Sequence, residues 1–206
     1  MPEKEGSCLG VRFYRAGHSA IRRLKHDHAP LNFGFRVWTA SWVLMKYLED
    51  QRLPRGLKVM EVGCGWGLAG IFCAKSLAAA TTCVDADPEV FPFLRAHAEL
   101  NQVEVKTLLK RFEDLDEHDL AGTDLLIGAD ICFWDEMSAP LLGLIGRALT
   151  AGVRLVLIAD PGRSSFEELA ARAGREYGGG TVTFSVRQPH PIQARLLRVS
   201  PPPPSR

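Results

Sequence analysis

Residues 59–70, VMEVGCGWGLAG, decide the fold class that this sequence predicts. The short apolar run at 57–62 is typical of a buried strand. Glycines then follow at positions 63, 65 and 67, where they let the backbone turn tightly and let a ligand approach without a Cβ in its way. Small and apolar residues over 68–79 predict a helix. A strand, a glycine turn and a helix in this order begin a doubly wound α/β fold, which binds nucleotide-like ligands at this first turn.

Two different ligands fit these glycines. Residues 65–70 match G-x-G-x-x-G, the pattern of dinucleotide-binding turns. Residues 61–67 match E-x-G-x-G-x-G, the pattern of S-adenosylmethionine sites. The second pattern is favoured because Gly63 directly follows the predicted strand. It is also favoured because the Glu61 carboxylate would repel a pyrophosphate but could meet a cationic cofactor end, directly or through water.

An acidic residue at the end of the next predicted strand fits either ligand. Asp85 lies 24 residues after Glu61, and its carboxylate can accept hydrogen bonds from both ribose hydroxyls. Asp87 is a rival for this role, although Asp87 followed by Pro88 is typical of the start of a helix. This acidic residue therefore does not discriminate between the two cofactors.

Strand and helix patterns alternate from residue 35 onward. The predicted strands are 57–62, 81–84, 103–108, 124–129, 153–159, 181–186 and 193–199, and the predicted helices are 37–49, 68–79, 88–100, 135–149 and 164–176. Such alternation predicts a Rossmann-like α/β fold, with a seven-stranded, mostly parallel sheet and helices on both faces. The last two strands have too short a connection for a crossover helix, so they are expected to form an antiparallel hairpin. Ser164 and Ser165 are expected to cap the last helix.

The two ends of the chain differ from its middle. Residues 1–33 are predicted to be an N-terminal extension with a basic edge, in which 11–14 and 20–24 form a β-hairpin about Gly17. A solvated edge or a docking surface for an acidic partner would explain its basic character. The Pro-rich residues 201–206 predict a disordered tail, because proline cannot donate a backbone hydrogen bond.

Composition excludes several classes of protein. The chain has 206 residues, a length typical of one domain, and its 25 Lys and Arg against 24 Asp and Glu give a net charge of +1. This neutrality argues against a protein that binds nucleic acid through bulk charge, and no apolar run is long enough for a membrane span. The five cysteines contain no C-x-x-C pair, and the six histidines show no metal-ligand spacing, so no metal site is predicted. Buried reduced thiols and an N-terminus without an apolar leader predict a cytoplasmic location.

These residues give the chain a family resemblance. It resembles the class I, seven-β-strand methyltransferases that depend on S-adenosylmethionine, and within them the family-16 group, which includes protein lysine methyltransferases. The matching pieces are GFRVW at 34–38 with Leu44 and Leu48, EVGCGWGLAG at 61–70, VDADPEV at 84–90 with Asn101, and DLLIGADICF at 124–133. The resemblance implies a 3-2-1-4-5-7-6 strand order with the cofactor over the C-terminal ends of the strands. It also implies that 34–200 is the methyltransferase domain.

The resemblance implies a set of cofactor-binding residues. They are Trp38, Glu61, Gly63, Cys64, Gly65, Gly67, Asp85, Ala86, Phe112 and Ala129. Trp38 is placed on a helix that resembles the family's lid over the cofactor, although an ordinary core aromatic would fit too. Phe112 is placed beside the adenine, and Glu113 or Asp114 could accept a hydrogen bond from the adenine amino group.

The predicted catalytic residues follow the fourth strand of the sheet. Asp130 and Phe133 resemble the group's D-x-x-Y/F motif, and Asp130 could hold one N–H of an amine so that its lone pair is aimed at the methyl carbon. Phe133 and Trp134 could form apolar walls against the substrate, and Arg163 could shape the substrate rim. The alternatives are that Asp130 caps the helix after it, that the two aromatic residues pack in the core, and that residues 160–163 form only a tight turn.

The sequence therefore predicts an S-adenosylmethionine-dependent N-methyltransferase that acts on a protein lysine as a monomer. One alternative is methylation of a small nitrogenous metabolite, such as a pyridine or an amine. Others are a nicotinamide-dependent oxidoreductase and a cofactor-binding protein without turnover. A nucleic-acid amino group is disfavoured as substrate, because the fourth strand ends in Ala-Asp-Ile-Cys at 129–132 instead of the Asn-Pro-Pro-Tyr or Asp-Pro-Pro-Tyr of those methylases.

Overall fold

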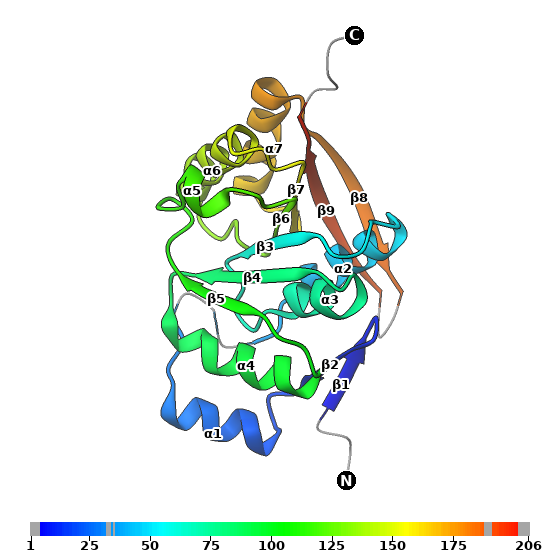
Figure 1. The fold of residues 1–206 in the computed structure, drawn as a ribbon, viewed down its shortest axis with the longest axis vertical. Helices are drawn as coiled ribbons and strands as arrows, with labels where there is room; N and C mark the ends of the chain where they lie inside the picture. The colour runs from blue at the N-terminus through cyan, green and yellow to red at the C-terminus, as the bar shows by residue number, and fades with distance from the viewer. Residues whose placement is uncertain (1–4, 32–33, 35, 188–190, 202–206) are drawn as a thin grey trace.

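The computed structural model describes residues 5–31, 34, 36–187 and 191–201. Its centre is a seven-stranded sheet in the order β5-β4-β3-β6-β7-β9-β8 (Figure 1). The strands are β3 (Lys58–Val62), β4 (Ala80–Asp85), β5 (Lys106–Leu109), β6 (Leu125–Ala129), β7 (Leu155–Asp160), β8 (Gly180–Val186) and β9 (Ile192–Val199). Counted along the sheet-forming part of the chain, this is the predicted order 3-2-1-4-5-7-6, which is confirmed.

The direction of the strands also agrees with the prediction. Strands β3 to β7 pair in parallel, whereas β9 pairs antiparallel with both β7 and β8. In this register Val62 of β3 lies opposite Val84 of β4 and Gly128 of β6. The C-terminal ends of three strands therefore meet at one edge of the sheet, where their following loops lie close together.

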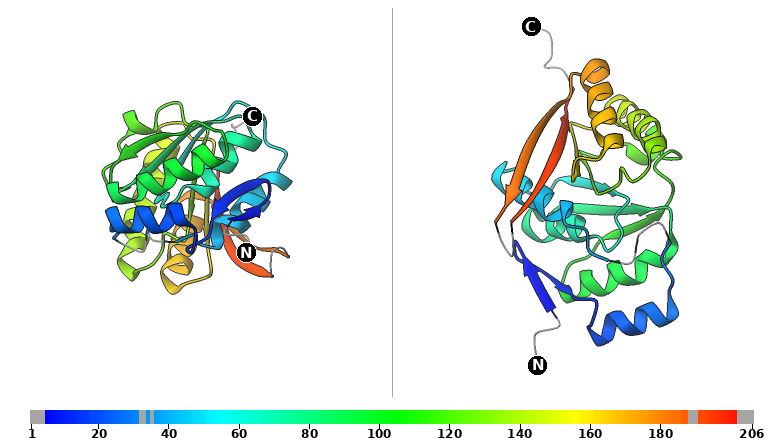
Figure 2. Two further views of the ribbon diagram at one scale, coloured as in Figure 1. Left: turned by 90° about the horizontal axis from the view of Figure 1, so that it is seen from below. Right: turned by 180° about the vertical axis from the view of Figure 1, so that it is seen from behind.

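Side-chain alternation along the strands builds a core on each face of the sheet. Val59, Ile127 and Leu157 pack with α2 (Ala40–Asp50), α3 (Leu68–Ser76) and α4 (Phe91–Leu100). Their sequence neighbours Met60, Leu126 and Val156 point the other way, toward α5 (Glu117–Leu120), α6 (Ser138–Thr150) and α7 (Ser164–Tyr177). Figure 2 shows this layered arrangement from two further sides. Among the described helices, none combines the length and apolar character that a bilayer crossing needs.

The predicted cap of the last helix is wrong. The side chain of Ser165 is buried and donates to the carbonyl of Cys132, and Ser164 donates to Asp135, so neither hydroxyl caps α7. The Asp160 carboxylate instead accepts from the backbone amides of Gly162 and Arg163. A carboxylate that accepts from amides two and three residues later closes a tight turn before the helix.

The predicted N-terminal hairpin pairs different residues. Strand β2 (Val11–Tyr14) pairs antiparallel with β1 (Glu5–Cys8), not with 20–24. The segment that was expected as the second strand lies in helix α1 (Ser19–Asp27), which buries Ile21 and is capped by the His18 side chain at the amide of Ala20. Residues 202–206 of the predicted tail and the turn residues 188–190 lie outside the described residues.

Two buried polar residues of α4 and its end hold β2 against the rest of the molecule. The Asn101 side chain pairs with both backbone groups of Arg12, at 2.8 Å for each hydrogen bond. Nε2 of His97 accepts from the amide of Tyr14 at 3.1 Å, and its Nδ1 donates to the carbonyl of Phe93 at 2.7 Å. Helix α1 also packs against α4, so hairpin and helix lie together beside α4 (Figure 1).

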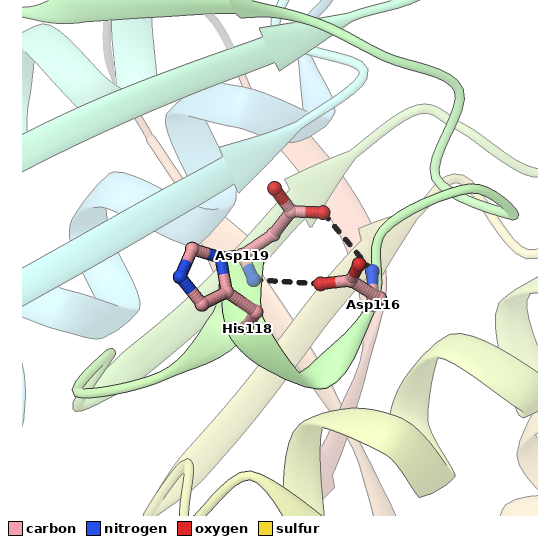
Figure 3. Close-up of side chains that lie close together, drawn as sticks. All are labelled: Asp116, His118 and Asp119. Atoms are coloured by element: carbon pink, nitrogen blue, oxygen red, sulfur yellow. Dashed lines mark hydrogen bonds between the residues drawn. The ribbon is translucent and has the colours of Figure 1, made fainter.

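A cluster of Asp116, His118 and Asp119 lies at the start of α5 (Figure 3). It is the group among the described residues whose atoms are close enough to hold a metal ion. Its carboxylates already have partners, because Asp116 and Asp119 accept from each other's backbone amides in a capping box and Lys110 pairs with Asp119. The helix cap accounts for the cluster, and we infer no metal site from it.

The buried His97 makes a pH-dependent contribution to stability. Burial lowers the pKa of His97 below its ordinary value of 6.5. As pH falls through about 6.5, the unfolded state takes up the proton first, so the contribution of His97 to stability is lost below that pH. We expect His97→Gln to unfold about 1–2 kcal/mol more easily than the wild type at pH 7.5, because a buried hydrogen-bonded ring is lost. Urea unfolding should show this difference shrinking toward pH 5, and a difference that stays constant with pH would contradict the assignment.

Candidate active site

A cavity of about 480 Å³ opens at the C-terminal edge of the parallel strands. Its walls come from the loops after β3, β4, β5 and β6 and from the segment that leads into α2. The residues that line it are Leu31, Gly34, Arg36, Val37, Trp38, Ser41, Glu61, Gly63, Cys64, Gly65, Trp66, Gly67, Leu68, Val84, Asp85, Ala86, Val90, Lys110, Arg111, Phe112, Glu113, Ala129, Asp130, Ile131, Phe133, Trp134 and Met137. All ten residues that the resemblance assigned to the cofactor are among them.

The glycines of the loop after β3 have distinct roles. Gly63, Gly65 and Gly67 all have positive φ, at 61°, 51° and 71°, a backbone conformation that favours glycine. A Cβ at Gly63 would lie 2.5 Å from Cγ2 of Ile131, and one at Gly67 would overlap the side chain of Leu94. A Cβ at Gly65 would meet nothing within 4 Å. The first and third glycines are thus required by packing, whereas Gly65 keeps backbone exposed to the cavity, as a bound cofactor needs.

Asp85, the last residue of β4, and Asp87, two residues later, have different surroundings in the structure. Asp85 lines the cavity, and its carboxylate accepts from the amides of Gly65, at 2.9 Å, and Asp87, at 3.0 Å. Burial raises the pKa of Asp85. Asp87 does not line the cavity; its carboxylate accepts from the amides of Glu89 and Leu31, and so caps the 3₁₀ turn Pro88–Val90. Asp85 is therefore the one placed to accept from a ligand.

The Glu61 carboxylate lies beneath the glycine loop. It is buried, and its Oε2 accepts from the amide of Gly70 at 2.9 Å and lies 3.7 Å from Sγ of Cys83. Burial raises the pKa of Glu61 to about 8, against the lowering effect of the Gly70 hydrogen bond. One oxygen thus supports the start of α3, and the residue also borders the cavity.

Residues 110–113 form one end of the cavity. Phe112 is half-buried there, and Glu113 pairs with Arg111 at 2.5 Å. The guanidinium of Arg147 on α6 holds this segment by donating to the carbonyls of Phe112, Glu113 and Leu115 at 2.7–3.1 Å. Arg147 is a supporting residue that the sequence did not reveal, because nothing in the local pattern of α6 distinguishes it.

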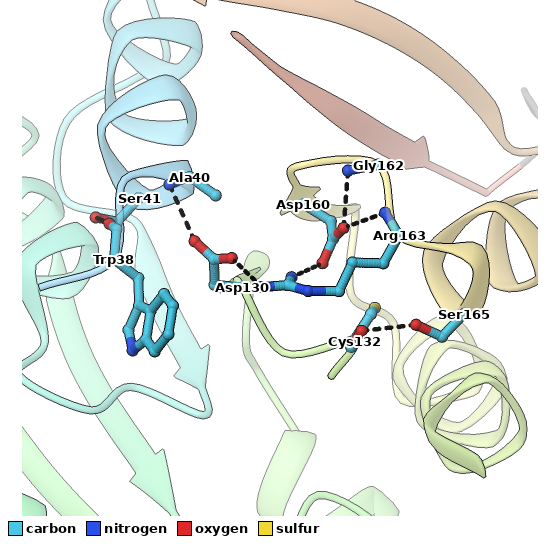
Figure 4. A network of polar contacts seen from close by, with 9 residues as sticks. All are labelled: Trp38, Ala40, Ser41, Asp130, Cys132, Asp160, Gly162, Arg163 and Ser165. Atoms are coloured by element: carbon cyan, nitrogen blue, oxygen red, sulfur yellow. Dashed lines mark hydrogen bonds and ion pairs between the residues drawn. The ribbon is translucent and has the colours of Figure 1, made fainter. Parts of the chain in front are cut away.

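Asp130 connects three elements at the opposite end of the cavity (Figure 4). Its Oδ2 accepts from the amide of Ala40, the first residue of α2, at 3.1 Å, and its Oδ1 accepts from Nη2 of Arg163 at 3.0 Å. The side chain caps α2, not the helix that follows it, so the capping alternative is corrected. Burial raises the pKa of Asp130, and the Ala40 amide and Arg163 act in the opposite direction.

Three aromatic side chains form a wall beside Asp130. The ring of Phe133 lies 5.1 Å from that of Trp38, edge to face, and 6.1 Å from that of Trp134. Trp134 is 43% exposed, so the wall reaches the surface, and neither Phe133 nor Trp134 belongs to the closed core. Trp38 precedes α2 and is not part of the helix, which corrects its predicted position. The guanidinium of Arg36 lies 3.9 Å from the centre of its ring.

The position of Arg163 differs from the prediction. It does not line the cavity and lies behind Asp130 and Phe133. Its guanidinium bridges the carboxylates of Asp130 and Asp160 and lies 4.4 Å from the centre of the Phe133 ring. Residues 160–163 form the tight turn that was the alternative, and Arg163 does not contribute directly to the cavity wall.

Other lining residues were not predicted. Leu31, Arg36, Lys110, Arg111 and Met137 border the cavity as well. Arg36 lies inside the quoted GFRVW segment, and Lys110 and Arg111 directly precede Phe112. Their proximity in sequence to predicted residues could have indicated a place in the cavity wall. Leu31 and Met137 carry no such signal. Phe35, also in the quoted segment, lies outside the described residues.

Comparisons with known proteins agree with this geometry. The sequence profile of a family described as lysine methyltransferase matches residues 20–168. The protein N-lysine methyltransferase METTL21A of Danio rerio is 34% identical over 183 residues, covering 86% of this chain and 80% of that protein. The electron transfer flavoprotein beta subunit lysine methyltransferase of Xenopus laevis is 29% identical, covering 65% of this chain and 56% of that protein.

Solved structures agree on the fold. The crystal structure of a SAM-dependent methyltransferase from Agrobacterium tumefaciens has a TM-score of 0.65 at 17% identity and covers 98% of this chain and 72% of that one. The seven-strand order, the glycine loop with Asp85, and the family match over more than half of the sequence lead to one conclusion. The chain is an S-adenosylmethionine-dependent methyltransferase and belongs to the lysine methyltransferase family.

Proposed function

We propose that this methyltransferase modifies the side-chain amine of a lysine in a protein, at the end of the cavity bounded by Trp38, Asp130 and Phe133. The observation that carries the proposal is Asp130, a residue of the cavity lining whose buried carboxylate lies beside an aromatic wall that reaches the surface at Trp134. The name of the Danio rerio relative supports a protein acceptor. A surface opening suits a lysine presented by another protein, because only its extended side chain needs to enter.

The other end of the cavity fits the cofactor. When bound, S-adenosylmethionine supplies a methyl group on a sulfonium, which is already activated for transfer. Asp85 would accept from ribose hydroxyls, the open backbone at Gly65 would let the cofactor approach, and Phe112 would lie beside its adenine. Arg147 would keep the Phe112 segment in place through its three carbonyl contacts.

The residues near Asp130 suit a neutral amine. A lysine nitrogen must lose its proton before its lone pair can form a bond to carbon. A carboxylate has about four acceptor sites, and the structure fills one on each oxygen of Asp130, so it can accept a further N–H and orient the lone pair. The apolar faces of Phe133 and Trp38 disfavour the ammonium form through desolvation.

Three further expectations complete the proposal. The five cysteines are all buried and unpaired, which supports a reducing, cytoplasmic location. The boundaries of the methyltransferase domain at 34 and 200 stay a prediction, and the family match begins earlier, at residue 20, within α1. A monomeric state also stays a prediction.

Labelled S-adenosylmethionine added to fractionated lysate tests the acceptor class. We expect the label in methyl-lysine of a protein, identified by mass spectrometry after digestion. Label that appears only in the small-molecule fraction would overturn the protein-lysine proposal and would favour a metabolite as acceptor.

Replacing Asp85 and Asp87, one at a time, tests how the cofactor is held. Asp85→Asn should raise the Kd for S-adenosylhomocysteine about tenfold to a hundredfold, because hydrogen bonds to a charged acceptor are worth about 1.5–3 kcal/mol. Asp87→Asn, the matched control, should lower the melting temperature with a smaller change in Kd, because Asp87 caps the following turn outside the cavity. Calorimetric titration measures both, and equal losses of affinity would contradict the assignment.

Asp130→Asn tests the methyl-transfer end. This variant keeps the size of the side chain and an acceptor for the Ala40 amide but removes the charge. We expect transfer into the protein fraction to slow by roughly a hundredfold, the size of effect seen when one preorganised polar contact is removed. The Kd for S-adenosylhomocysteine should change less than about threefold, well under the effect of one hydrogen bond.

The control for Asp130 is Asp135→Asn. Asp135 is exposed nearby, contacts Ser164 and lies outside the cavity lining, so its variant should transfer at the wild-type rate. A wild-type rate in Asp130→Asn would remove Asp130 from the mechanism.

A further inference from the structure

We infer that Arg163 is a positioning residue of the methyl-transfer site, fixing the Asp130 carboxylate and the Phe133 ring together without entering the cavity. This inference rests on the proposed function, because it assigns Arg163 a role in the use that the enzyme makes of Asp130. Three contacts of one guanidinium carry it, two to buried carboxylates and one to an aromatic face.

The guanidinium is itself held in place. Asp160 is fully buried at the end of β7, and its Oδ2 accepts from Nη1 of Arg163 while its Oδ1 accepts from the backbone amides of Gly162 and Arg163. The side chain and backbone of Arg163 are therefore both tied to the same carboxylate. Since a guanidinium is planar and rigid, its second nitrogen is left at a defined position, 3.0 Å from Oδ1 of Asp130 (Figure 4).

The contact fixes how Asp130 is presented to the cavity. Arg163 holds Oδ1 and the Ala40 amide holds Oδ2, so rotation of the carboxylate is blocked from both sides. The backbone at Asp130 has φ of 58°, in the left-handed region that non-glycine residues seldom adopt. Such a conformation persists where surrounding contacts determine it, and Arg163 and Ala40 supply two of those contacts.

The same guanidinium acts on the charge of the site. Its positive charge favours the ionised form of Asp130, which keeps both oxygens available as acceptors. It also covers the Phe133 ring at 4.4 Å, and a fixed cation there disfavours a second cation against the same ring. The fixed cation opposes an ammonium ion at this end of the cavity, and so offsets part of the attraction that the ionised Asp130 exerts on one.

Few other titratable groups face this pair. Asp160 comes from β7 and the buried Cys132 from the loop after β6, whereas the part of α2 in contact with Asp130 offers a backbone amide. On the exposed side, Asp135 contacts Ser164 and Glu167 pairs with Arg195. Among the described residues, Arg163 is therefore the cation whose replacement is expected to change the electrostatic environment of Asp130.

The test compares Arg163→Gln and Arg163→Lys with Arg195→Gln. Arg195 is a matched control, because it is an arginine of the same region whose hydrogen bonds go to Glu167 on α7 and to Thr181. The acceptor is the protein that the wild-type enzyme labels in lysate. Four quantities are measured for each variant: kcat, KM, the Kd for S-adenosylhomocysteine and the melting temperature.

We expect Arg163→Gln to lower kcat roughly tenfold to a hundredfold, the effect of a small displacement of a reacting group, with KM and Kd changed less than about threefold. The acid limb of the pH profile of kcat/KM should move to higher pH, because the pKa of Asp130 rises when the neighbouring cation is removed. Arg163→Lys should restore the acid limb, since it keeps the charge, but only part of kcat, since it lacks the planar fork. Arg195→Gln should match the wild type in kcat and in pH profile.

A wild-type kcat and pH profile in Arg163→Gln would overturn the inference. So would a loss of the same size in Arg195→Gln, or a lower melting temperature in both Arg163 variants with the acid limb unmoved, because each points to a structural role alone. If the wild-type enzyme labels no protein lysine, the proposed function fails first. If the wild type is active and Asp130→Asn is slow while Arg163→Gln is not, the proposed function stands and only the role of Arg163 fails.

Discussion

The contact between Asp85 and the amide of Gly65 joins the end of β4 to the glycine loop that follows β3. Parallel pairing of β3 with β4 brings the C-terminal ends of both strands to the same edge of the sheet, and this hydrogen bond fixes the glycine loop against the end of β4. The left-handed turns at Gly63, Gly65 and Gly67 then direct the chain into α3. The cavity depends on this arrangement, because its floor is the backbone that the hydrogen bond holds in place.

Asp130 plays the corresponding role at the other end of the cavity. Through one carboxylate it ties the loop after β6 to the first turn of α2 and, by way of Arg163, to the turn before α7. Trp38 lies two residues before Ala40, so the same contact helps to set the position of the aromatic wall. Asp130, which we propose acts in methyl transfer, therefore also connects separate parts of the fold. Its geometry is set by elements that lie far apart in the sequence.

Much of the fold follows from local patterns in the sequence. The strand order and the cavity lining agree with the prediction. The apolar strands, the glycine loop and Asp85 follow one another in the sequence, and all of them indicate the same α/β fold. The N-terminal hairpin was predicted wrongly, since Ile21 and Leu24 satisfy a helical spacing as well as a short apolar run. Its true turn, at Leu9 and Gly10, has positive φ at both residues. Leucine seldom adopts that conformation, so the sequence does not indicate a turn there.

The errors at the site have a different cause. Ser164 and Ser165 have the right residue type for a cap, but the buried Asp160 carboxylate takes over the turn before α7. Arg163 and Arg147 act through contacts 33 and 32–35 residues away in sequence, and no local pattern encodes such distances. Chemistry that depends on residue type was predictable, whereas the side chains that support it became visible only in three dimensions.

The five buried cysteines lie in five different parts of the fold: β1, the glycine loop, α3, β4 and the loop after β6. Burial raises the pKa of each thiol, so in the closed state each reacts slowly with an alkylating reagent. A thiol becomes reactive only when its own element opens, and elements of a protein open with different free energies. The alkylation rate of each cysteine in the native protein therefore measures how readily its own region of the fold opens.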